Sequence, residues 1–234
     1  MYIPQFIKKY FKQSEMMRFY RQFIKAGDLC FDIGANIGER TDVFLKLNTK
    51  VICVEPQSKC MSTLQKKYQN NKNVTLVRAA LGSNESEGEL LLCDETDECS
   101  TLSIDFVKTY THVSNFHWNK KEKVSVLTLE SLCALYGVPK LCKIDVEGYE
   151  SEVFRGMRTD IEIICFEFNY PIIADTIKCL ETIALLGTYK CNFIAYERMD
   201  LMLDEWMGIK EFKDRLRELI ESNVLTGEII ARRV

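Results

Sequence analysis

Carboxylate side chains stand at places in the sequence where they could bind a charged ligand or accept a proton. Asp32 precedes a bend that begins at Gly34. Asp145 and Glu147 are separated by one residue, and Glu167 lies near the end of a later apolar segment. Carboxylates in such places can orient an ammonium group, take a proton from a hydroxyl or hold a metal ion. Which of these they do depends on the elements that carry them.

Short apolar segments alternate with amphipathic ones along the chain, which is typical of a parallel sheet with helical crossovers. We expect strands over residues 29–33, 50–55, 74–81, 140–145, 161–168, 190–196 and 224–231. We expect helices over residues 39–48, 61–68, 128–136, 148–157, 173–186 and 209–220. Ligands of such sheets bind at the carboxyl ends of the strands, where Asp32, Asp145 and Glu167 would lie.

One stretch interrupts this alternation. Residues 88–93 are expected to form an edge strand, and residues 94–123 form a polar segment long enough to serve as a lid or a binding segment. This segment contains both histidines, His112 and His117. It also contains Ser100-Thr101, which could hydrogen-bond substrate or cofactor.

The bend after the first strand is expected to hold a cofactor. Gly34 and Gly38 flank a tight turn, where a ligand can approach bare backbone at the beginning of a helix. Asn36 stands where a dinucleotide fingerprint needs its middle glycine. Asp32 would repel a diphosphate but attract an ammonium or a sulfonium. The bend therefore favours S-adenosylmethionine over NAD.

The end of the second strand supports a nucleoside ligand. Glu55 is followed by Pro56, and a carboxylate there can accept hydrogen bonds from both hydroxyls of a ribose. Nicotinamide cofactors share this feature, so an NAD-binding or non-catalytic nucleotide-binding domain is the less favoured alternative.

Several segments in combination resemble the FkbM-type methyltransferases, which are class I enzymes dependent on S-adenosylmethionine. They are Phe31-Asp-Ile-Gly-Ala-Asn-Ile-Gly38, Val54-Glu-Pro56, Ala79-Ala-Leu-Gly82, Thr128-Leu-Glu130 and Lys143-Ile-Asp-Val-Glu-Gly-Tyr-Glu150. The resemblance extends from about Gly27 to Phe168, and the family's usual Thr-Leu-Asp is Thr-Leu-Glu here. Residues 1–26, 94–123 and the C-terminal portion carry no matching motif.

The resemblance implies a Rossmann-like α/β fold, with a seven-stranded, mostly parallel sheet and helices on both faces. It implies that residues 32–38 hold the amino acid moiety of S-adenosylmethionine and that Glu55 holds the ribose. The predicted cofactor-binding residues are Asp32, Gly34, Ala35, Asn36, Gly38, Glu55, Pro56 and Ala80.

Methyl transfer to an alcohol requires alignment of the acceptor and removal of its proton. The predicted catalytic residues are Asp145, Glu147 and Glu167. Asp145 could bind the cofactor's ammonium or act as the base, and Glu147 could act as the base or compensate a helix N-terminus. A histidine from the 94–123 segment is a further option for the base.

A metal-assisted mechanism is the less favoured alternative. Asp145, Glu167 and Asn169 could form an oxygen-rich magnesium site, as in catechol-type enzymes. We predict no metal ligand, because such spacing arises readily where strand ends are polar. Lys143 is expected to flank its strand rather than to take part in catalysis.

Residues 1–26 are predicted to form a basic amphipathic helical extension before a methyltransferase domain over residues 27–234. Six basic residues and one acidic residue give the extension a charge of +5. We expect it to pack on the domain as a cover, with contact to anionic lipid as the alternative. The whole chain has a charge of -3 and a pI of about 5.6, which disfavours a nucleic-acid partner.

The cysteines indicate a reducing compartment. Five of the ten fall inside predicted strands, where cysteine behaves as a small apolar residue: Cys30, Cys53, Cys142, Cys165 and Cys191. No apolar run reaches membrane-spanning length. We therefore expect a cytoplasmic protein.

These observations lead to one functional hypothesis. We expect an S-adenosylmethionine-dependent O-methyltransferase that acts on a hydroxyl of a small molecule or a glycan. An RNA or protein methyltransferase is the alternative. The Asn-Pro-Pro-Tyr pattern of amine methylation is absent after the fourth strand, where the chain has Asp-Val-Glu-Gly.

Overall fold

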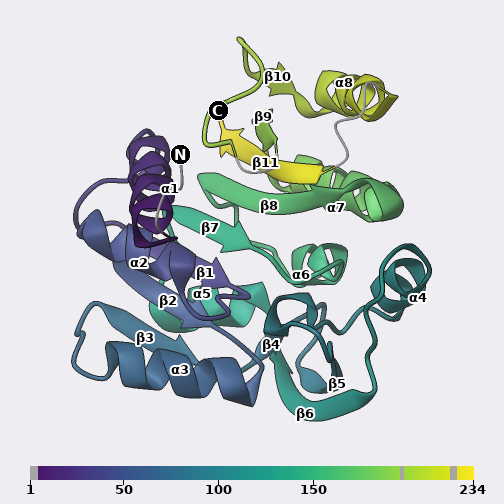
Figure 1. The fold of residues 1–234 in the computed structure, drawn as a ribbon. Coiled ribbons are helices and arrows are strands. Elements are labelled where there is room, and N and C mark those ends of the chain that lie inside the picture. Colours follow the sequence, from purple (N-terminus) through teal and green to yellow (C-terminus); the bar gives the residue numbers. More distant parts are fainter. Residues whose placement is uncertain (1–4, 196–197, 222–225) are drawn as a thin grey trace.

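The computed structural model describes residues 5–195, 198–221 and 226–234. Its main sheet has the strand order β10-β9-β11-β8-β7-β1-β2-β3 (Figure 1). The strands are β1 (Leu29–Ile33), β2 (Lys50–Val54), β3 (Val74–Val77), β7 (Leu141–Ile144), β8 (Ile163–Asn169), β9 (Tyr189–Ala195), β10 (Met207–Gly208) and β11 (Thr226–Arg233). From β3 to β8 every neighbouring pair is parallel, whereas β11 is antiparallel to β8 and β9. The expected Rossmann-like α/β fold is confirmed, and the two-residue β10 extends the expected seven strands.

Helices cover both faces of this sheet (Figure 1). They are α1 (Gln5–Tyr20), α2 (Glu39–Lys46) and α3 (Ser58–Tyr68) on one face, and α5 (Leu129–Tyr136), α6 (Glu150–Arg155), α7 (Ile173–Leu186) and α8 (Ile209–Glu221) on the other. Buried side chains of β1 alternate between the two layers, with Cys30 on the first and Phe31 on the second. Burial on both faces explains why these strands are almost entirely apolar in sequence.

The strand expected over residues 74–81 was wrong, because the chain changes sheets within it. β3 ends at Val77, and β4 (Ala80–Leu81) belongs to a second sheet with the order β4-β6-β5. Arg78 lies at the break, is exposed and pairs with Glu122 of β6 (Lys120–Leu127) at 2.8 Å. The sequence shows one apolar run, and only the pairing partners divide it.

The segment 94–123 is more regular than predicted. It contains the short 3-10 helix η1 (Asp97–Cys99), helix α4 (Ile104–Val113) and the beginning of β6, while β5 (Ser86–Leu92) precedes it. The Ser103 hydroxyl caps α4 by accepting a hydrogen bond from the Phe106 amide at 3.1 Å. Phe106 is buried and makes an edge-to-face contact with Trp118. A tertiary aromatic contact therefore stabilises a helix with only one buried residue.

The helix predicted within residues 1–26 begins at Gln5 and ends at Tyr20 in the described chain. Residues 1–4 lie outside the described residues, as do residues 196 and 224–225 of two predicted strands. Met16, Phe19, Tyr20 and Ile24 are buried among residues of α2, α3 and the sheet. This packing agrees with the interpretation of the segment as a cover. Within the described ranges, none of the helices combines the length and apolar character needed to traverse a bilayer.

The strand cysteines are buried as predicted. Cys30, Cys53, Cys142, Cys165 and Cys191 are free thiols in β1, β2, β7, β8 and β9. Each fills space between the sheet and its helices in the way a small apolar residue would.

Candidate functional site

The bend after β1 packs against the backbone that follows β7. Gly34 has a φ of 76°, and a Cβ at this position would overlap the carbonyl oxygen of Asp145. The amides of Gly34 and Ala35 both donate to the Val54 carbonyl at 3.0 Å, and the Asp145 amide donates to the Ile33 carbonyl at 3.0 Å. Glycine is therefore required where the ends of β1, β2 and β7 meet.

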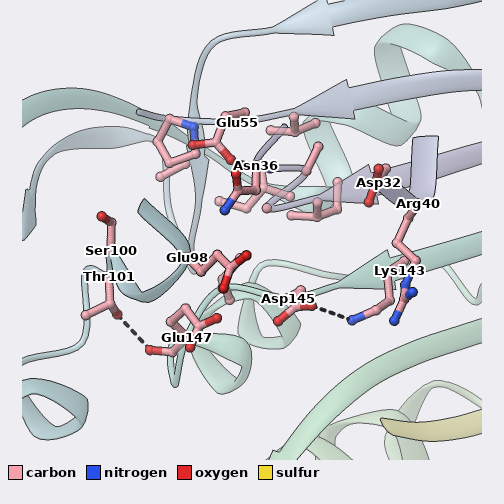
Figure 2. Close-up of a pocket in the computed structure, with 18 of the residues that line it drawn as sticks. Asp32, Asn36, Arg40, Glu55, Glu98, Ser100, Thr101, Lys143, Asp145 and Glu147 are labelled. Carbon is pink, nitrogen blue, oxygen red and sulfur yellow. Dashed lines mark hydrogen bonds and ion pairs between the residues drawn. The ribbon is translucent and has the colours of Figure 1, made fainter. Parts of the chain in front are cut away.

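A cavity of about 330 Å³ opens at these strand ends (Figure 2). This volume lies at the lower end of the range of roughly 300–1,000 Å³ that is usual for small-molecule sites. The predicted residues that line it are Asp32, Gly34, Ala35, Asn36, Glu55, Pro56, Ala80, Asp145, Glu147 and Glu167. Strand ends far apart in the sequence thus contribute to a single cavity.

Gly38 is the exception among the predicted residues. It precedes α2 with a φ of 82° and is not among the described residues that line the cavity. The Tyr68 hydroxyl of α3 donates to its carbonyl at 3.0 Å. Gly38 therefore shapes the bend from behind.

Asp32 is a buried carboxyl group on the side of the sheet that α2 covers. The Thr41 hydroxyl of α2 donates to its Oδ2 at 2.5 Å. Burial raises the pKa of Asp32, while the bond from Thr41 and the charges of Lys143 and Arg40 act in the opposite direction. Asp32 links the end of β1 to the beginning of α2.

Glu55 lies beside the bend on the opposite side of the cavity from Arg40 and Lys143 (Figure 2). Its two carboxylate oxygens accept hydrogen bonds from the amides of Asn36 and Gln57, both at 2.8 Å. Burial raises the pKa of Glu55 to about 7, although both amide bonds lower it. The carboxylate is held in place, and its free lone pairs can accept from ligand hydroxyls.

Lys143 was expected only to flank its strand, and this prediction was wrong. It lies inside β7, is 2% exposed at its side chain and lines the cavity. Its Nζ is 3.0 Å from Asp145 Oδ2 and 3.7 Å from Glu228 Oε2 of β11. Burial alone would lower the pKa of Lys143, but the charges of Asp145 and Glu228 outweigh it and raise that pKa. Its spacing from Asp145 was the available signal, because residues two apart in a strand share a face.

Arg40 also lines the cavity, and sequence reasoning missed it. It belongs to the first turn of α2, and its Nη2 is 3.5 Å from Glu228 Oε2. No local pattern distinguishes an arginine of this kind from a solvated one on a helix surface.

Asp145, Glu147 and Glu167 converge on the cavity, with one oxygen from each within 4.8 Å of the others. Burial, with the nearby charge of Glu167, raises the pKa of Glu147 well above its ordinary value. Burial, with the charge of Asp145, does the same for Glu167. The group differs from the magnesium set considered above, because Asn169 is not among the described residues that line the cavity.

The loop before α4 approaches the same group, but the histidines do not. Ser100 and Thr101 line the cavity, and the Thr101 hydroxyl donates to the Glu147 carbonyl at 2.7 Å. His117 is exposed, with its Nδ1 at 2.8 Å from Glu95, and His112 is exposed on α4. Neither histidine is among the described residues that line the cavity.

Comparison with known proteins identifies a family. A model described as "Methyltransferase FkbM domain" matches residues 32–201. No curated protein matches the chain. The family match covers the bend, the cavity strands and the segment 94–123, for which the sequence offered no family motif.

Three similar solved structures are methyltransferases or a related protein. Precorrin-6y C5,15-methyltransferase from Geobacter metallireducens is 12% identical, with 95% of this chain and 87% of that chain covered and a TM-score of 0.48. A putative O-methyltransferase from Klebsiella pneumoniae is 11% identical, with coverage of 95% and 79% and a TM-score of 0.48. Aeropyrum pernix fibrillarin, solved with bound S-adenosyl-L-methionine, is 11% identical, with coverage of 88% and 67% and a TM-score of 0.46.

The cavity fits the cofactor of this family. Gly34 leaves open the space that a side chain would occupy, Glu55 offers acceptors for ribose hydroxyls, and Asp145 offers a carboxylate to an ammonium group. From the family match, the chain belongs to the FkbM methyltransferases and is an S-adenosylmethionine-dependent methyltransferase.

Proposed function

We propose that this enzyme transfers a methyl group to a hydroxyl of a small molecule or a glycan. The observation that carries the proposal is the convergence of Asp145, Glu147 and Glu167, within 4.8 Å of one another on the cavity wall. S-Adenosylmethionine supplies the electrophilic methyl group. An alcohol acceptor needs a base within reach of its proton, and this group of carboxyls offers one.

Within the group, Glu147 and Glu167 are our candidates for the base. Burial raises the pKa of both carboxyl groups, so each binds a proton more tightly than an exposed glutamate would. Two such groups close together favour a state in which they share one proton, and the unprotonated oxygen can accept another from the acceptor. We assign Asp145 to the cofactor's ammonium instead, because its ion pair with Lys143 stabilises the charged carboxylate.

The charge of the cavity supports a small uncharged acceptor over RNA. Glu98, Glu147 and Glu167 all line it, and carboxylates repel the phosphates of a nucleic acid. The net charge of -3 points the same way. A protein or RNA acceptor remains the alternative outcome of the test.

The test measures S-adenosylhomocysteine formation with sugars, glycans and small alcohols, and in parallel with RNA and protein. Turnover confined to hydroxyl compounds is expected, and methylation confined to RNA or protein would refute the proposal. Glu147→Gln and Glu167→Gln are expected to lower kcat on the best acceptor by about 10²- to 10⁴-fold, as loss of a general base does. Glu89→Gln is the matched control, since Glu89 is exposed on β5 and pairs with Lys121 at 2.9 Å.

A further inference from the structure

Arg40 and Lys143 bring two positive charges to one end of the cavity. Both approach the same oxygen, Glu228 Oε2, at 3.5 Å and 3.7 Å. Figure 2 shows their side chains on the side of Asp145 that faces away from Glu55 and Asn36. This end of the cavity therefore combines cationic groups with a carboxylate.

The remainder of the cavity wall is acidic. The acidic residues that line it are Asp32, Glu39, Glu55, Asp97, Glu98, Asp145, Glu147 and Glu167. Among the described lining residues the basic ones are Lys12, Arg40 and Lys143. Lys12 is an exposed residue of α1 that pairs with Glu39 at 3.4 Å. An anionic group on a ligand would therefore be stabilised beside Arg40 and Lys143 and repelled elsewhere.

Lys143 and Arg40 differ in how far their charges are already neutralised. Lys143 is 2% exposed and lies within ion-pair distance of both Asp145 and Glu228. Arg40 is 23% exposed, and Glu228 at 3.5 Å is its acidic partner among the described residues. A guanidinium has five N–H donors in a planar fork that matches a carboxylate. Arg40 has donors to spare for a ligand, and Lys143 does not.

Glu228 holds Arg40 at this position. The Tyr20 hydroxyl of α1 donates to Glu228 Oε1 at 3.2 Å, and the Arg40 Nη1 contacts Met16 Sδ of α1. The guanidinium is therefore placed before any ligand arrives, which reduces the entropy lost on binding.

We propose that Arg40 binds the carboxylate of the methionine moiety of S-adenosylmethionine. Lys143 is a positioning residue that orients Asp145 toward the ammonium of the same moiety. The zwitterionic end of the cofactor then meets one cation and one anion, at the end of the cavity farthest from Glu55. This assignment rests on the cofactor and is independent of the methyl acceptor.

The test is calorimetric binding of two ligands that differ in the amino acid moiety. S-Adenosylhomocysteine carries the moiety, and 5′-methylthioadenosine lacks it. Arg40→Met is expected to weaken S-adenosylhomocysteine binding by about 10- to 100-fold, the range for a lost charge-assisted hydrogen bond. The affinity for 5′-methylthioadenosine is expected to change by less than about threefold, since that ligand does not reach Arg40.

Arg18→Met is the matched control. Arg18 belongs to α1, pairs with Asp200 at 3.0 Å in an exposed position, and is not among the described residues that line the cavity. Both ligands are expected to bind this variant as they bind the wild type. Equal weakening of both ligands by Arg40→Met, or unchanged binding of S-adenosylhomocysteine, would overturn the proposal.

A second comparison covers the case in which Arg40→Met does not fold. The wild type is titrated with S-adenosylhomocysteine and with its decarboxylated analogue, which lacks only the carboxylate. Roughly tenfold or weaker binding of the analogue is expected, and equal affinity would overturn the proposal. Arg40→Lys, which keeps the charge but loses the fork, is expected to narrow this gap. A wild type that binds neither ligand nor 5′-methylthioadenosine would instead refute the cofactor assignment.

Discussion

Lys143 and Asp145 form an ion pair of 3.0 Å between a buried ammonium group and a carboxylate on the cavity wall. The two residues are two positions apart at the end of β7, so the strand itself brings them to one face. The pair thus connects the interior of the sheet to the cofactor site.

Replacing Lys143 is expected to destabilise the fold. Lys143→Met leaves Glu228 buried without this cation, and uncompensated buried charges of this kind cost about 3 kcal/mol in free energy of unfolding. Urea unfolding measures the change. Lys121→Met is the control, because its pair with Glu89 is exposed and contributes about 1 kcal/mol or less. Equal stability losses in the two variants would contradict the structural role of Lys143.

Gly34 is expected to tolerate no side chain. Gly34→Ala would drive a methyl group into the Asp145 carbonyl at a φ of 76°, so the bend must move away from the cavity. The positive φ alone costs about 1–2 kcal/mol, and S-adenosylhomocysteine binding is expected to be lost. Gly208→Ala is the control, since nothing lies within 4 Å of a Cβ there. Thermal unfolding and calorimetry measure both effects, and normal binding by Gly34→Ala would contradict the packing of the bend.

Glu55 is expected to make cofactor binding depend on pH. Burial raises its pKa from 4.5 to about 7, and the charges of Asp32 and Glu122 add to this. Ribose hydroxyls donate to the carboxylate form, so binding releases a proton and should tighten as the pH rises from about 6 to 8. Calorimetry across this range measures the slope. Glu55→Gln should bind more weakly and reduce the slope, and an unchanged slope would exclude Glu55 as its source.

The same carboxyl predicts the opposite trend for the protein without ligand. A carboxyl with a raised pKa stabilises the fold fully below its unfolded pKa, and that contribution disappears as the pH rises from about 4.5 to about 7. Its loss is worth up to about 3 kcal/mol at pH 8. The difference in unfolding free energy between wild type and Glu55→Gln, measured at pH 5 and pH 8, isolates this contribution.

The cysteines are expected to be nearly inert in the folded protein. Nine of the ten are buried, and Cys99 alone is partly exposed. Burial raises the pKa of Cys99 to about 12, so little thiolate is present near neutral pH. Titration with a thiol reagent should detect at most one slow group before unfolding and ten after it. Rapid reaction of several native thiols would contradict this burial.

Local sequence was enough to predict the bend and its strands. The run Leu29–Ile33 followed by Gly34 specifies a buried strand and a sharp turn, because glycine is the residue for which a positive φ carries no penalty. Asp32, Asp145 and Glu167 could also be placed together, since the carboxyl ends of parallel strands lie at one edge of the sheet.

The division of residues 74–81 between two sheets could not be predicted in this way. An apolar run shows that a segment is buried and does not show which strand it pairs with. The same holds for α4, which depends on the contact between Phe106 and Trp118.

By itself the sequence determined the fold class, the family and the glycine bend, because these depend on residue types at short and regular spacing. Only the tertiary structure decided that Arg40 and Lys143 share Glu228, a residue of the last strand. The antiparallel insertion of β11 beside β8 brings Glu228 there, and no local pattern encodes a contact across so much of the chain. The electrostatics of the site are therefore a property of the sheet topology.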